Sequence, residues 1–155
     1  MSSTPPPLTP EQQVRRHWMG VLARADGAAI AARLDAAPPL PEATRLRGPE
    51  TGLVMARGRQ GGDGAPFNLG EMTVTRCSVR DAAGRVGHAY VAGRDQLQAE
   101  LAARLDAALQ DPALRLVLLD AVIAPLAAEQ AERAAAVAAK AAATKVQFFT
   151  MQTMR

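Results

Sequence analysis

The chain has little of what disulfides, metal sites and large aromatic cores require. It has one cysteine, Cys77, among 155 residues, which excludes an internal disulfide and a cysteine-based metal site. Aromatic residues make up only 3% of the chain, and alanine supplies much of its 48% of apolar residues. The core must therefore rest on leucine, valine and methionine, and a core this thin is one reason for a chain to depend on partners.

Targeting and membrane-spanning segments are also missing from the sequence. Residues 1–10 have neither the basic segment nor the apolar segment of a signal peptide. The most apolar stretch, residues 113–128, is interrupted by Arg115, Asp120 and Pro125. We therefore expect a cytoplasmic protein that has no membrane partner.

Lysine is scarce, and the positive charge comes from arginine. The net charge is +3, yet Lys140 and Lys145 are the only lysines among 18 basic residues. An alanine-rich, arginine-rich chain can reflect genomic base composition, so the high isoelectric point is weak evidence for nucleic acid. Residues 51–94 hold six arginines against three acidic residues and so account for the whole net charge. Such a local basic surface attracts phosphate groups or an acidic partner.

The first third of the chain predicts a disordered lead-in followed by two helices. Residues 1–9 are rich in serine, threonine and proline. Thr9 is the expected N-cap of a helix that starts at Pro10 and ends near Gly27, and residues 28–36 form a second helix. The apolar stripe of the first helix consists of Val14, Trp18, Val21, Leu22 and Ala25.

The middle third predicts an antiparallel sheet of three to four strands. Strands are expected at residues 43–47, 52–60, 69–80 and 86–91, with the first two separated by Gly48-Pro49. Asp81 to Gly84 forms a hairpin turn. The apolar pattern changes phase near Arg76, which indicates a β-bulge there.

The last third predicts helices that lead to a short apolar tail. Asp95 is the expected N-cap of a helix with Gln98 as its capping-box partner, and a second helix follows Asp111. Pro125 opens a third, alanine-rich helix that ends near residue 143. The sequence therefore indicates a single α+β domain over residues 10–155, with N-terminal helices, a small antiparallel sheet, a helical C-terminal third and a partner-docking tail at about 144–155.

The first candidate site is the glycine-rich loop at residues 57–64 (Arg-Gly-Arg-Gln-Gly-Gly-Asp-Gly), which carries two arginines. Glycines let backbone amides approach an anion, and the planar arginine side chains bind phosphate oxygens in pairs. The loop is not a Walker loop, because Gly-Lys-Ser/Thr is absent. The alternative is a hairpin loop with solvated arginines. The phosphate or interface candidates are Arg57, Arg59, Gly61, Gly62, Gly64, Arg76 and Arg94.

No complete catalytic or metal site can be assembled from the sequence. His88 and Asp95 flank a strand-to-helix junction and could serve as acid, base or charge partners, but Asp95 is already explained as an N-cap. His17 has no second metal ligand at helical spacing. We therefore expect neither catalytic residues nor a bound metal or cofactor.

Phe148 and Phe149 form the strongest interaction signal. They are two of the three phenylalanines and follow a weakly apolar helix. Burying each side chain contributes about 1.5–3 kcal/mol. Two readings stay open: the tail docks on a partner, or it folds back onto the chain's own sheet.

Six stretches stand in order from Arg15 to Met151: residues 15–19 (Arg-Arg-His-Trp-Met), 50–55 (Glu-Thr-Gly-Leu-Val-Met), 61–67 (Gly-Gly-Asp-Gly-Ala-Pro-Phe), 73–76 (Thr-Val-Thr-Arg), 93–95 (Gly-Arg-Asp) and 146–151 (Val-Gln-Phe-Phe-Thr-Met). Together they resemble the PhnG family, the G subunit of the bacterial carbon–phosphorus lyase system. No one stretch is diagnostic, but the ordered set is specific. Residues 152–155 depart from the family, which often continues with Arg-Gly and an acidic residue.

The resemblance implies a subunit of a larger enzyme. Family members join subunits H, I and J in a core complex, and the L subunit is also required for activity. The complex transfers the ribose triphosphate moiety of MgATP to a phosphonate such as methylphosphonate and releases adenine. The resemblance attributes the nucleosidase-type chemistry to the I subunit, so MgATP is a substrate of the complex and not a cofactor of this chain.

Two hypotheses from other classes accompany this one. A nucleic-acid-binding module would use the arginine-rich hairpin, but lysine clusters and interleaved aromatic residues are missing. A stand-alone hydrolase or transferase would use His88 and Asp95. On the favoured hypothesis, the basic hairpin region contributes to an interface or to a triphosphate-binding rim, and the tail that contains Phe148 and Phe149 docks on a neighbouring subunit.

Overall fold

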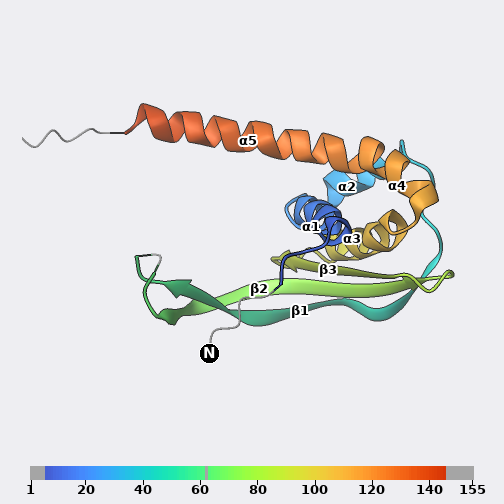
Figure 1. Cartoon of the computed structure of the whole chain (residues 1–155), viewed down its shortest axis with the longest axis horizontal. Coiled ribbons are helices and arrows are strands. Elements are labelled where there is room, and N and C mark those ends of the chain that lie inside the picture. The colour runs from blue at the N-terminus through green and yellow to red at the C-terminus, as the bar shows by residue number, and fades with distance from the viewer. Residues whose placement is uncertain (1–5, 62, 146–155) are drawn as a thin grey trace, which may run out of the picture.

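A three-stranded antiparallel sheet with helices on one face forms the body of the molecule (Figure 1). The computed structural model describes residues 6–61 and 63–145. The strands β1 (Ala43–Arg59), β2 (Pro66–Asp81) and β3 (Val86–Ala92) lie in the order β1-β2-β3. The α+β prediction is confirmed, and no helix in the described part of the chain is long and apolar enough to cross a membrane.

β1 is one continuous strand, where the sequence predicted two. Gly48 and Pro49 do not end it, because the pairing with β2 adjusts by register shifts between Arg45 and Glu50. β1 lies at the edge of the sheet, where a proline costs no hydrogen bond within the ladder. A bulge is therefore present opposite Arg76, but the additional residues belong to β1, and β2 pairs regularly with β3 there.

The N-terminal helices pack on the sheet through α3 (Gln96–Leu109). The helix α1 (Pro10–Leu22) has Thr9 as its N-cap, as predicted, and the structure adds a capping box in which the Thr9 side chain accepts from the Gln12 N–H. Gly27 does not end α1 but begins α2 (Gly27–Leu34). A Cβ atom at Gly27 would lie 2.8 Å from the Gln98 backbone nitrogen of α3, so glycine permits the close approach of these two helices.

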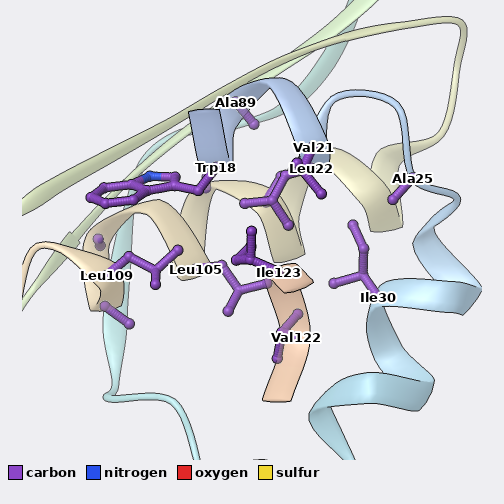
Figure 2. Packing of buried hydrophobic residues seen from close by; sticks show 14 of the residues in the cluster. Trp18, Val21, Leu22, Ala25, Ile30, Ala89, Leu105, Leu109, Val122 and Ile123 are labelled. Atoms are coloured by element: carbon purple, nitrogen blue, oxygen red, sulfur yellow. The ribbon is translucent and has the colours of Figure 1, made fainter. Parts of the chain in front are cut away.

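The core lies where α1, α2, α3 and the chain after α3 meet (Figure 2). Its fully buried side chains include Leu22, Ile30, Leu105, Leu109 and Ile123. Val14, which amphipathic spacing placed in the apolar stripe of the first helix, is 44% exposed instead. Much of the buried face of α3 is alanine, which lets the helix approach the sheet closely.

The C-terminal third is a nearly continuous helical segment that leaves the body. It comprises α4 (Pro112–Leu118), a π-helical turn at Leu119–Ile123 and α5 (Ala124–Ala143). Pro125 supplies no backbone N–H, and the widened turn before it accommodates that loss without breaking the segment. From residue 131 to residue 145 every residue is exposed, and α5 stands clear of the sheet (Figure 1).

The hairpin of β1 and β2 also extends beyond the body. β3 pairs with β2 only from Val74 to Arg80. Residues 53–59 and 66–73 therefore form a two-stranded ribbon, here called the hairpin arm, which extends on the same side of the molecule as α5 (Figure 1).

Candidate functional site: the open sheet face and the hairpin arm

The predicted loop residues lie at the tip of the hairpin arm. The Arg59 side chain donates through Nη1 to the Gly64 carbonyl at 3.1 Å, and the Gly64 N–H donates to the Gln60 carbonyl. Gly61 has a φ of 63°, and a Cβ at Gly64 would lie 2.6 Å from the Gln60 carbonyl oxygen. These glycines therefore serve the turn itself, and Gly62 lies outside the described residues.

The structure does not bring the predicted arginines together. Arg76 donates through Nε to Glu50 at 2.9 Å, and Arg47 contacts the same carboxylate oxygen at 2.9 Å. Arg57 lies seven residues beyond Glu50 along β1, which corresponds to about 23 Å of strand. Arg94 lies at the base of the arm beside Leu53. One phosphate group could not contact the arginines at the tip and those on the sheet at once.

Ser78 and His88 form a pair on the sheet face that no helix covers. The Ser78 Oγ and the His88 Nδ1 are 3.0 Å apart across β2 and β3. The sequence reasoning missed this pair, although pairing the predicted strand ends Arg80 and Val86 and counting back would have placed the two residues opposite each other. The His88 side chain is exposed and Ser78 is half-buried, and within the described residues no carboxylate hydrogen-bonds the His88 ring. The pair therefore lacks the third group and the enclosure that nucleophilic catalysis requires.

The hydrolase hypothesis requires Asp95 to lie beside His88, but the Asp95 carboxylate binds other groups. Its Oδ1 accepts from the Gln98 N–H at 2.9 Å and its Oδ2 from the Gly27 N–H at 3.1 Å. The carboxylate thus caps α3, as predicted, and links it to α2. The capping box is incomplete, however, because the Gln98 side chain donates to the Leu22 carbonyl instead.

Asp106 is the most completely enclosed carboxylate of the described residues. Its side chain is 0% exposed and accepts from Trp18 Nε1 at 2.9 Å, from Arg15 at 3.0 and 2.7 Å and from the His88 backbone N–H at 2.9 Å. The group joins α1, β3 and α3. All of its acceptor positions are occupied, so its role is structural.

A second ionic cluster lies at the turn between β2 and β3. Arg85 bridges Asp81 and Asp111, each at 2.8 Å. The pKa of Asp111 is lowered by the backbone N–H of Ala113 and then by Arg85. No group of three or more metal-ligating side chains occurs in the part of the chain that the structure describes.

The hairpin arm exposes large apolar side chains on both of its faces. Leu53 and Met55, at 62% and 49% exposure, alternate along β1 and share one face. The opposite face carries Phe67, Leu69 and Met72, because Phe67 pairs with Gly58, Leu69 packs over that glycine and Met72 pairs with Val54. The alternating pattern of residues 52–60 was visible in the sequence, but nothing there showed that helices would leave both faces bare.

Comparison with known proteins shows a family and a relative to which this chain is similar. The family model described as phosphonate metabolism protein PhnG matches residues 13–153. A protein of Rhizobium meliloti (strain 1021), the alpha-D-ribose 1-methylphosphonate 5-triphosphate synthase subunit PhnG, is 47% identical over 140 residues, which cover 88% of this chain and 87% of the relative. Phe148 and Phe149 fall within the matched range but outside the described residues.

Proposed function

The chain belongs to the PhnG family of phosphonate metabolism proteins, and we propose that it is the G subunit of an alpha-D-ribose 1-methylphosphonate 5-triphosphate synthase. The observation that carries the proposal is the 47% identity to a protein of that name over nearly the whole of both chains. It works in the cytoplasm as part of a multi-subunit enzyme of the carbon–phosphorus lyase system.

The partners in this proposal are subunits H, I and J, with the L subunit needed for activity. The assembled enzyme transfers the ribose triphosphate moiety of MgATP to methylphosphonate and releases adenine. The G subunit supplies contacts, and the groups that act on the glycosidic bond lie on a partner.

The hairpin arm is the contact with the other subunits in this proposal. A two-stranded ribbon is marginally stable in water unless something packs against it. Leu53 and Met55 face one way and Phe67 and Leu69 the other, so a groove that covers both faces fits better than a flat surface. Arg57 and Arg59 at the tip favour a groove that ends in carboxylates or in substrate phosphate.

Co-expression with the H, I and J subunits tests the assembly. Changing Leu53 and Leu69 together to serine removes one apolar side chain from each face of the arm and should reduce co-purification of the partners. Leu116→Ser is the matched control, because Leu116 on α4 is 77% exposed and far from the arm in the chain. If the partners co-purified with the double variant as well as with the wild-type chain, the hairpin arm would not be part of the interface.

A rate measurement on the assembled enzyme tests the triphosphate-binding rim. With the L subunit, MgATP and methylphosphonate present, changing Arg57 and Arg59 together to alanine should raise the KM for MgATP or slow adenine release. Arg24→Ala, an exposed arginine just after α1, controls for loss of charge. If the double variant showed wild-type kinetics, Arg57 and Arg59 would have no role in binding the substrate.

A further inference from the structure

An apolar pocket opens beside β3. Its volume is about 520 Å³, and its walls come from α1, β3, α3 and the segment before α1. Its apolar walls are formed mainly by Leu8, Met19, Ala23, Val91 and Ala102. This volume lies within the range of sites that enclose a ligand or an anchoring side chain.

The free edge of β3 borders this pocket. Backbone groups of alternate strand residues point the same way, so those of Val86, His88 and Tyr90 all point away from β2. The Val86 carbonyl accepts from Arg15 and Gln110, and the His88 N–H donates to Asp106. The described residues provide no hydrogen-bond partner for the N–H and C=O of Tyr90. This part of the edge is therefore a template for another strand.

We propose that the pocket and the β3 edge at Tyr90 bind residues 146–151 from a second copy of this chain. The segment Val-Gln-Phe-Phe-Thr-Met adds to β3 as a further strand, and a phenylalanine of the Phe148-Phe149 pair fills the apolar pocket. This is recognition by strand addition, in which backbone hydrogen bonds hold the peptide and pockets select alternate side chains.

The reach of the chain favours a second copy over the chain's own tail. The Gln130 side chain donates to the Val21 carbonyl at 2.9 Å, which anchors α5 to α1 near the pocket. The thirteen residues from Gln130 to Ala143 carry the chain about 20 Å away along the helix. The six residues from there to Phe149 span about 20 Å when fully extended. A tail of this length, fully extended, reaches back only as far as Gln130. To enter the pocket of its own chain it would also have to pass around α1, which is about 10 Å wide.

The exposure of α5 supports the same assignment. Residues 131–143 are all exposed, and Val137, the large apolar side chain among them, is 67% exposed. Such a helix adds little to the stability of its own domain. Exchange of identical terminal segments between two copies needs one kind of site and no new surface.

The isolated chain provides the first test, by light scattering and sedimentation. The wild-type chain should form a dimer. Phe148→Ala with Phe149→Ala should weaken the dimer by at least about 100-fold, because each of the two tails loses the phenylalanine that fills a pocket. Gly20→Leu should do the same by filling the pocket, and it should not unfold α1, because a Cβ there meets only the flexible Arg24 side chain at 3.8 Å.

Gly20→Ala is the matched control, since it makes the same change in helix propensity with little added volume and should leave the dimer intact. Mixing the Gly20→Leu chain with the Phe148→Ala, Phe149→Ala chain tests exchange directly. Each alone should be monomeric, and the mixture should regain dimer through one intact tail and one intact pocket.

A monomeric wild-type chain, or a dimer insensitive to either variant, would overturn the proposal. So would a mixture that stays monomeric. The test does not depend on the proposed function, because no other subunit is present. A monomeric isolated chain would not contradict assembly through the hairpin arm. Loss of that assembly would not contradict the dimer.

Discussion

Replacing Asp106 with asparagine should destabilise the chain more than any other single carboxylate-to-amide change among the described residues. The Asp106 carboxylate is 0% exposed and accepts four hydrogen bonds from Arg15, Trp18 and His88. Asparagine keeps the shape of the side chain but offers only one oxygen. Whichever way the amide is turned, its NH₂ group faces two of the four donors.

The magnitude follows from the two donors that lose their acceptor. Each buried, unsatisfied group costs about 1–3 kcal/mol. The Arg15 side chain is 34% exposed and can turn partly to water, which brings the expected loss to about 2–4 kcal/mol. For a chain of this size the melting temperature should fall by about 5–15 °C.

Thermal unfolding followed by circular dichroism and by Trp18 fluorescence measures this loss. Trp18 is the single tryptophan, and its Nε1 is one of the four donors, so its emission reports the site directly. Glu100→Gln on the same helix is the control, because its partner Arg45 is largely exposed and the pair should contribute little. A melting temperature for Asp106→Asn within about 2 °C of the control would refute the argument.

Three further changes test the packing and the ion pairs. A Cβ at Gly87 would lie 2.0 Å from a backbone oxygen of α3, so Gly87→Ala should cost about 3 kcal/mol or more in urea unfolding, whereas Gly52→Ala, with open space around it, should be nearly neutral. Burial, which alone would raise the pKa of Asp81, is outweighed by hydrogen bonds from Arg85, and the pKa lies below its ordinary value of 3.8. The stabilisation from Asp81 is therefore present above that value and lost as the pH falls through the lower, folded-state pKa, so Arg85→Ala should reduce the acid dependence of the urea midpoint. Burial raises the pKa of the Cys77 thiol, which is 1% exposed, so iodoacetamide should modify it only in the unfolded chain.

Local signals in the sequence predicted the ends of helices and the central hairpin well. The Thr9 cap, the Asp95 cap and the turn at Asp81 to Gly84 each depend on a few neighbouring residues, and all are present in the structure. Gly27 was misassigned because glycine ends helices more often than it begins them. Its role depends on the distance to α3, which the local sequence does not contain.

Features that depend on distant residues could not be predicted. The Asp106 site joins residues 91 positions apart, and nothing near Asp106 marks it as buried. The continuity of β1 through Pro49 depends on the strand lying at the sheet edge. The arginines looked like one basic site because they are close in sequence, whereas the extended strands separate the tip from the sheet.

The hairpin arm should be the least protected strand pair in the isolated chain and should gain protection in the assembled enzyme. Beyond Val74 no third strand supports it, and its large apolar side chains face water on both sides. Hydrogen exchange of residues 53–59 and 66–73 should therefore approach that of unfolded peptide in the chain alone, while β2 and β3 near Cys77 stay protected. Binding in a groove that covers both faces should slow exchange across the whole arm, not only along one strand. Equal protection of the arm and the core strands in the isolated chain would mean that the ribbon is stable without a partner, and the physical case for its role in assembly would be lost.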